Sequence, residues 1–111
     1  MMKQTGRALN LGLALMAALG TSLWAADAAA GKGFYSKKCQ TCHGPEGNGN
    51  PGMAKALNVV FKELGSADIQ KKSDADLKKV VMEGSGKMKA VSGLMPAEVD
   101  DVVAHVRSLK K

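Results

Sequence analysis

The amino-acid sequence predicts an all-α domain. In several stretches the apolar residues recur three and four positions apart, which places them on one face of a helix. No stretch alternates apolar and polar residues over the length of a strand. The chain has 111 residues, enough for one domain, and glycine and proline separate its periodic stretches.

Residues 1–25 have the composition of an export signal. Lys3 and Arg7 provide a positively charged start, and an apolar run over residues 9–19 follows. Small residues come next, so we expect cleavage between residues 25 and 28 and a periplasmic protein. The apolar run is short for a bilayer span, so we expect no stable membrane insertion. An uncleaved N-terminal anchor is the alternative.

The first half of the remaining chain predicts two helices and a loop. Asp27 is a suitable N-cap for a helix over residues 28–42. Glycine, proline and asparagine dominate residues 44–52 and predict a loop. Apolar residues at helical spacing then predict a second helix over residues 53–64.

The second half predicts two further helices. Ser73 is a suitable N-cap, and acidic residues follow it in the first turn of a helix that ends at Gly84. A loop over residues 84–94 comes next, and Pro96 suits the first position of a last helix. The apolar face of that helix comprises Val99, Val102, Val103, Val106 and Leu109.

The positive charge of the chain does not indicate nucleic-acid binding. The net charge is +6 at pH 7, but the lysines are spread along the sequence. Beyond the signal the only aromatic residues are Phe34, Tyr35 and Phe61, so basic and aromatic side chains do not interleave. A domain this small has a limited core of its own, and a large apolar cofactor would add to it.

One pentapeptide carries chemistry. Residues 39–43 read Cys-Gln-Thr-Cys-His, the C-x-x-C-H pattern of covalent haem attachment. Because residues three apart share one face of a helix, Cys39 and Cys42 can form thioethers with the two vinyl groups of one porphyrin. His43 follows directly and can reach the iron as the proximal ligand. We therefore predict one covalently bound haem c.

Haem-free proteins could use the same side chains. A disulfide between the two cysteines is possible in an oxidising compartment, but it leaves His43 without a role. A thioredoxin-like site requires a preceding strand, which the sequence does not predict. A structural zinc site needs four ligands. Cys39, Cys42, His43 and His105 could supply them, although the position of His105 fits no short zinc-finger pattern.

Over essentially the whole region after the signal, the chain resembles the class I cytochromes c. Gly31 and Tyr35 precede the motif as the family's glycine and aromatic residue do, and residues 102–109 are similar to its last helix. The resemblance implies three to five short helices wrapped around one haem, with the first and last helices crossing closely at Gly31 and Val102. His105 stands where the family usually has Tyr or Trp, which we expect to weaken the aromatic contact there.

The resemblance also implies a methionine as the distal ligand of the iron, opposite the histidine. We predict Met88, because its glycine-flanked loop resembles the family's Gly-x-Gly-Lys-Met-Pro segment. Met95 is the runner-up, since a proline follows it, but it falls at the expected start of the last helix. Met53 follows the attachment motif too closely, and Met82 lies inside an expected helix.

These features predict an electron carrier and not an enzyme. The carrier domain would span residues 26–111 and act as a monomer that passes one electron between redox proteins. A haem protein with an open sixth site, for gas binding or catalysis, is the alternative. Lysines could surround the haem edge and steer acidic partners towards it, or they could be ordinary solvated surface. These lysines are Lys37, Lys38, Lys55, Lys62, Lys87 and Lys89.

Overall fold

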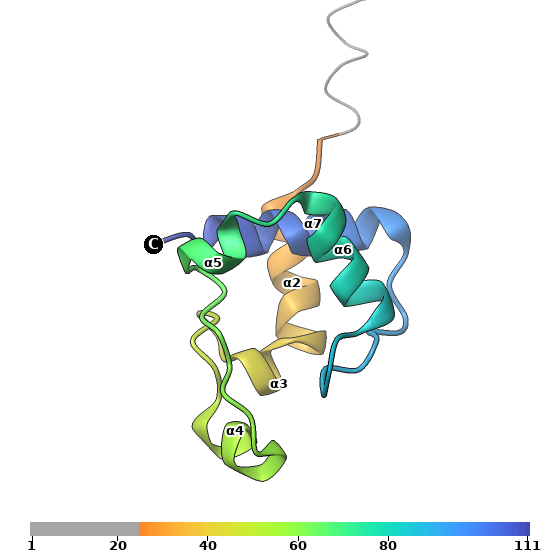
Figure 1. The fold of residues 1–111 in the computed structure, drawn as a ribbon. Helices are drawn as coiled ribbons and strands as arrows, with labels where there is room; N and C mark the ends of the chain where they lie inside the picture. Colours follow the sequence, from red (N-terminus) through yellow and green to blue (C-terminus); the bar gives the residue numbers. More distant parts are fainter. Residues whose placement is uncertain (1–24) are drawn as a thin grey trace, which may run out of the picture.

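The computed structural model describes residues 25–111, so the expected signal lies outside the described residues except for its last position. The described residues form six helices and no strand, which confirms the all-α prediction, although two of the helices are only four residues long. None of the six has the length and apolar character needed to cross a bilayer. Figure 1 shows α2 (Ala28–Lys38), α3 (Gln40–His43), α4 (Pro51–Leu57), α5 (Ala67–Gln70), α6 (Asp74–Glu83) and α7 (Pro96–Ser108).

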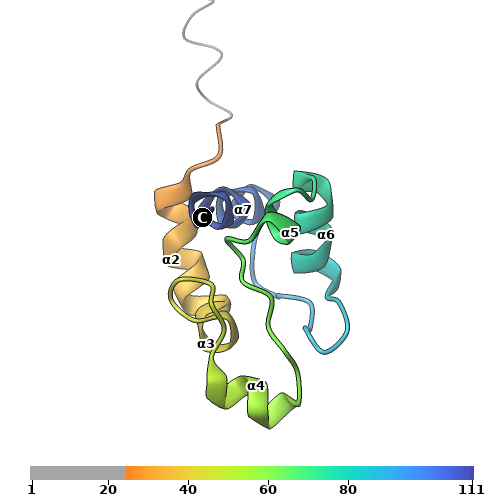
Figure 2. The same cartoon turned by 60° about the vertical axis from the view of Figure 1, so that its left-hand side comes forward.

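Helices α2 and α7 cross at close range (Figures 1 and 2). A Cβ atom on Gly31 would overlap the carbonyl oxygen of Asp101 and lie 3.0 Å from the backbone nitrogen of Val102. Only glycine therefore lets the two backbones approach this closely. The backbone N–H of Asp27 donates to Asp101 Oδ1 at 2.8 Å, so the start of α2 is fixed to the same part of α7. The crossing expected at Gly31 and Val102 is confirmed.

The core around this crossing is small. Tyr35 and Val102 are each 1 % exposed and form one cluster with Cys39. The Tyr35 hydroxyl donates to the carbonyl oxygen of Gly44 at 2.6 Å, immediately after the attachment motif. The core therefore connects the helix crossing directly to the motif. Phe34, Leu64 and Leu94 pack against the cluster from its edges.

Arg107 ties the connection between α5 and α6 to α7. Its guanidinium donates to the carbonyl oxygens of Gln70 at 2.7 Å and Lys72 at 2.6 Å, and to the Asp74 carboxylate at 2.8 Å. These hydrogen bonds satisfy two carbonyl groups of the connection and also hold the first residue of α6. Because α6 leads into the loop that contains Met88, α7 also determines where that loop begins.

The first expected helix is interrupted inside the attachment motif. Helix α2 ends at Lys38, Cys39 forms a turn, and α3 begins at Gln40. The expectation of one continuous helix over residues 28–42 is therefore wrong. One helical turn is nevertheless kept, because the N–H groups of Cys42 and His43 donate to the Cys39 carbonyl oxygen at 3.2 and 3.0 Å.

The helix expected over residues 53–64 is much shorter. Helix α4 begins at Pro51 and ends at Leu57, because Asn58 adopts the left-handed conformation with a φ of 55°. Val59 and Phe61, two positions apart, both face one pocket from an extended segment. Their spacing suits an extended chain beside a pocket, and it is this tertiary environment that overrides the helical pattern. The short helix α5 was not expected.

The caps of the last two long helices agree with the sequence. Ser73 Oγ accepts from the backbone N–H of Asp76 at 3.1 Å and caps α6. Met95 is the N-cap residue of α7, and its backbone N–H donates to Glu98 Oε1 at 2.8 Å. Both helix starts, at Ser73 and Pro96, are confirmed.

His105 is a buried polar residue at the α2–α7 crossing. It is 6 % exposed, and its ring packs on Tyr35 with the centroids 4.8 Å apart. Its Nε2 has no hydrogen-bond partner among the described residues. Burial, and then the charge of Lys32, lower the pKa of His105 from its usual 6.5. A neutral imidazole thus packs on Tyr35 from the position where the resemblance leads one to expect Tyr or Trp.

Gly31→Ala is expected to lower the free energy of unfolding by about 3 kcal/mol, because the added methyl group meets backbone atoms that cannot rotate away. Gly33→Ala is the matched control on the same helix, since a Cβ there meets no atom within 4 Å. The control should be stabilised by up to about 1 kcal/mol. Denaturant titration measures both changes, and equal midpoints for the two variants would contradict the close crossing.

The lowered pKa of His105 predicts a loss of stability in mild acid. The unfolded chain binds the proton more readily than the folded protein, so stability should fall as the pH drops below 6.5. His105→Phe has no group that titrates at this position, so its free energy of unfolding should depend less on pH between pH 7 and about pH 5. Unfolding titrations of both proteins at several pH values measure the difference. If the difference in free energy of unfolding between the two proteins does not change with pH, the lowered pKa of His105 is contradicted.

Candidate functional site

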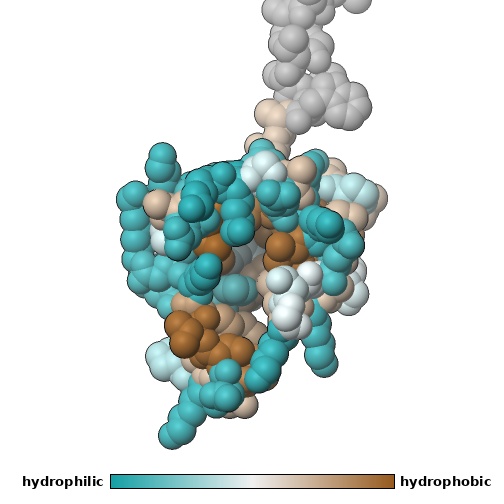
Figure 3. Space-filling model, in the orientation of Figure 1, coloured by the Kyte–Doolittle hydropathy of each residue, from teal (hydrophilic) through white to brown (hydrophobic). Residues whose placement is uncertain are grey.

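A mostly apolar pocket of about 580 Å³ opens between three parts of the chain. The first is the attachment motif, the second is the end of α4 with the segment after it, and the third is the loop between α6 and α7. Figure 3 shows apolar surface beside a hollow on this face of the molecule. The residues that line the pocket include Lys38, Cys39, Cys42, His43, Leu57, Val59, Phe61, Ser85, Lys87, Met88, Lys89, Ala90, Val91 and Ser92.

Both cysteines of the motif line this pocket with free thiols. Cys39 is buried and Cys42 is half-buried. Burial, and then the neighbouring Cys42, raise the pKa of Cys39 to about 11. Redox-active cysteines of the thioredoxin type instead have a lowered pKa. The environment of Cys39 therefore does not favour the thiol–disulfide alternative.

His43 lies on the same wall of the pocket. Its ring centroid is 5.5 Å from that of Phe61, and its Nδ1 is buried without a hydrogen-bond partner among residues 25–111. Burial lowers the pKa of His43, which favours the neutral imidazole, the form that coordinates metals. A buried polar atom without a partner costs about 1–3 kcal/mol. A neutral imidazole on the wall of a mostly apolar pocket therefore fits an apolar group that carries a metal ion.

The loop after the motif folds back and holds it in place. The N–H of Gly49 donates to the His43 carbonyl oxygen at 2.7 Å, and that of Asn50 donates to the Cys42 carbonyl oxygen at 2.9 Å. The Asn50 side chain donates to the Thr41 carbonyl oxygen at 3.1 Å. The free carbonyl groups at the end of α3 are thereby satisfied, so the motif is held rigidly on this side.

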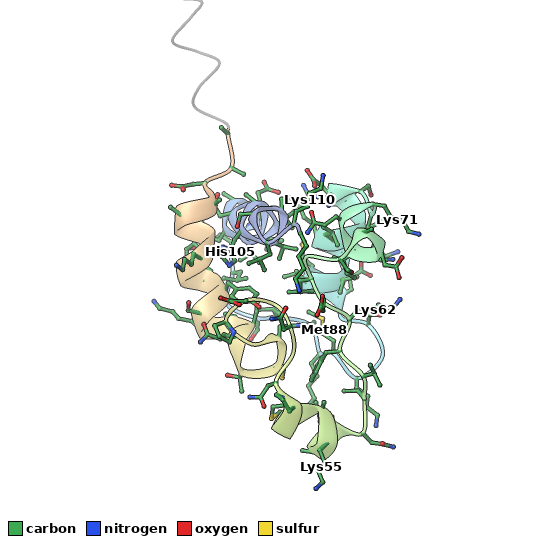
Figure 4. All side chains as sticks on the ribbon, turned by 90° about the vertical axis from the view of Figure 1, so that its left-hand side faces the viewer. Lys55, Lys62, Lys71, Met88, His105 and Lys110 are labelled. Carbon is green, nitrogen blue, oxygen red and sulfur yellow. The ribbon has the colours of Figure 1, made fainter. Side chains whose placement is uncertain are left out.

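Met88 lines the pocket from a tight turn on another wall. Ser85 and Met88 exchange two backbone hydrogen bonds of 2.9 Å each, and Gly86 between them has a φ of 57°. The N–H of Val91 donates to the Val81 carbonyl oxygen at 2.8 Å, which fixes the following segment to α6. In Figure 4, Met88 lies between the long helices and α4. The loop thus presents a half-buried thioether to the same cavity as His43.

The other candidate ligands lie elsewhere. Met95 caps α7 and is 67 % exposed, and Met82 on α6 is 54 % exposed. Neither they nor Met53 line the pocket. His105 is buried at the α2–α7 crossing. Of the four methionines considered, Met88 alone shares the cavity with the attachment motif.

No group of three His, Cys, Asp or Glu side chains that could hold a metal ion occurs within residues 25–111. A zinc site would require His105 beside Cys39, Cys42 and His43. In the structure His105 packs on Tyr35 instead, and these four side chains form no such group.

Sequence reasoning missed one wall of the pocket. Leu57, Val59 and Phe61 line it, but the helical interpretation of residues 53–64 concealed their role. The available signal was Asn58, a residue that tolerates the left-handed conformation and often ends a helix. With the helix ended there, the apolar residues at positions 59 and 61 would have been expected on one side of an extended chain.

Comparisons with known proteins agree with this geometry. Residues 26–106 match the family described as cytochrome C oxidase, cbb3-type, subunit III. Over 94 residues the chain is 33 % identical to cytochrome c-554(547) of Halothiobacillus neapolitanus. This alignment covers 78 % of this chain and 100 % of that protein. Among solved structures, the KustC0563 c-type cytochrome is similar with a TM-score of 0.62 and 32 % identity. That match covers 73 % of this chain and 98 % of the other.

Proposed function

Because this chain belongs to the family of c-type cytochromes, whose cofactor is covalently bound haem c, we propose that it carries single electrons between redox proteins. In this proposal Cys39 and Cys42 form the thioether bonds to the haem. His43 is the proximal ligand of the iron, and Met88 is the distal ligand. The supporting observation is that these four side chains line one mostly apolar cavity, with Cys39, Cys42 and His43 on one wall and Met88 on another.

The lining residues suit electron transfer without substrate chemistry. Haem c supplies a one-electron iron couple when bound. His43 offers a neutral imidazole, and a methionine sulfur favours the reduced metal and raises the reduction potential. Leu57, Val59 and Phe61 provide apolar contacts that exclude water. If His43 and Met88 both held the iron, the protein would leave no coordination position for a substrate.

The rim of the pocket suits acidic partners. Three of the six lysines expected around the haem edge line the pocket, namely Lys38, Lys87 and Lys89. Lys55 and Lys62 are exposed on α4 and the segment after it (Figure 4). Positive charge around an opening increases the rate of encounter with negatively charged proteins. We propose weak, transient complexes of this kind, since electron-transfer interfaces are small.

We further propose that residues 26–111 act as one monomeric domain in the periplasm. Lys3, Arg7 and the apolar run after them support export through a cleaved signal. The family match begins at residue 26, directly after the proposed signal.

Replacement of the two methionines tests the distal ligand. In Met88→Ala, the weak far-red charge-transfer band of a thioether–iron bond should disappear from the ferric spectrum, and CO should bind the ferrous protein at neutral pH. Met95→Ala is the control and should keep the band and exclude CO. If only Met95→Ala loses the band, the assignment of Met88 is wrong. If the wild-type protein binds CO freely, the open sixth site is correct instead.

Replacement of the cysteines tests the attachment. When produced in a host that matures cytochromes c, Cys39→Ala and Cys42→Ala should each keep one thioether bond. The pyridine haemochrome band of each should therefore shift from its wild-type position, because one vinyl group is left unreacted. The double variant should release all its haem into acidified acetone. A wild-type protein that is isolated colourless, with free or disulfide-bonded thiols, would contradict the proposal.

A further inference from the structure

The wall of the pocket formed by α4 has few connections to the rest of the molecule. Figures 1 and 2 show α4 at one end of the fold, away from α5, α6 and α7. Its main helix contact is with α3. Leu57 and the segment after it nevertheless line the pocket opposite the loop that contains Met88. The width of the pocket therefore depends on how α4 is held relative to that loop.

One hydrogen bond joins these two walls. The ammonium group of Lys87 donates to the carbonyl oxygen of Leu57 at 2.5 Å. Leu57 is the last residue of α4, where carbonyl groups lack donors within the helix and where a cation is favourable. Within the described part of the chain, it is the only hydrogen bond between residues 51–60 and residues 84–92.

The position of Lys87 couples this bond to Met88. The two residues are adjacent in the turn that Ser85 and Met88 close with two backbone hydrogen bonds. These two hydrogen bonds restrain the backbone of the turn, so a displacement of Lys87 also displaces the adjacent Met88. A bond that holds the Lys87 side chain on α4 therefore also limits how far Met88 can withdraw from the pocket.

We propose that Lys87 is a clasp: a positioning residue that closes the distal side of the pocket by holding the Met88 turn against α4. The role of Met88 as ligand rests on the function proposed above, whereas the contact between Lys87 and Leu57 does not. With the clasp closed, external ligands compete poorly for the metal, because the pocket must open before Met88 can leave. Loss of the clasp makes that opening more frequent.

Lys89 provides a matched control. It flanks Met88 on the other side, lines the same pocket and is exposed like Lys87. Its ammonium group makes no hydrogen bond or ion pair among the described residues. Lys87→Met and Lys89→Met therefore remove the same charge beside the same methionine, but only the first removes the bond to Leu57.

The test is a titration of the ferric protein with imidazole, whose neutral form responds little to the loss of a surface charge. Lys87→Met should raise the apparent affinity for imidazole about threefold, the effect of one exposed hydrogen bond. Lys89→Met should leave it unchanged, and Lys87→Arg, which keeps a cationic donor, should restore most of the wild-type value. An equal rise in both methionine variants would show an effect of charge, and no rise in Lys87→Met would show no clasp; either result overturns the proposal.

Hydrogen exchange separates the clasp from the ligand assignment. Amides of residues 51–60 should exchange faster in Lys87→Met than in Lys89→Met or the wild type, whichever residue binds the iron. If Met88→Ala keeps the charge-transfer band, the ligand assignment fails while this comparison still tests the clasp. Equal exchange over residues 51–60 in the two lysine variants would overturn the clasp even with Met88 established as the ligand.

Discussion

The close crossing of α2 and α7 is the constraint on which the rest of the structure depends. Gly31 allows the two backbones to touch, and Tyr35 and Val102 form the most deeply buried contact of the described residues. The Tyr35 hydroxyl also donates to the carbonyl oxygen of Gly44, the residue that follows the attachment motif. Arg107, near the end of α7, fixes the connection that leads into α6. One helix crossing thus positions both the motif and the start of the loop that carries Met88.

The pocket takes the place of the core that a domain of this size lacks. The buried cluster of Tyr35, Cys39 and Val102 is small, whereas Leu57, Val59 and Phe61 line the cavity. A short chain buries a modest fraction of its surface, so a large apolar cofactor contributes to folding as well as to function. Covalent attachment retains such a cofactor where the protein encloses it only in part. Because the protein encloses the site only in part, a single hydrogen bond such as that from Lys87 to Leu57 can influence access to it.

The helix starts were predictable because capping depends on a few adjacent residues. Asp27, Ser73 and Pro96 each begin a helix as expected. The extent of the second predicted helix was wrong because the helical spacing of its apolar residues outweighed the local end signal at Asn58. Helix α4 ends before Asn58, although the helical spacing of apolar residues continues beyond it. Val59 and Phe61 instead line a pocket whose other walls come from distant parts of the chain.

The all-α class and the C-x-x-C-H pattern of Cys39, Cys42 and His43 can be recognised without the structure, because helix signals and this spacing act within one or two turns of chain. Which methionine shares the pocket with them depends on how the folded chain brings distant loops together. Met88 and Met95 each had a local argument in their favour, and no local pattern says which one a folded chain turns inwards. The bond from Lys87 to Leu57 likewise joins residues 30 positions apart and arises only when α4 and the Met88 turn face each other across the cavity.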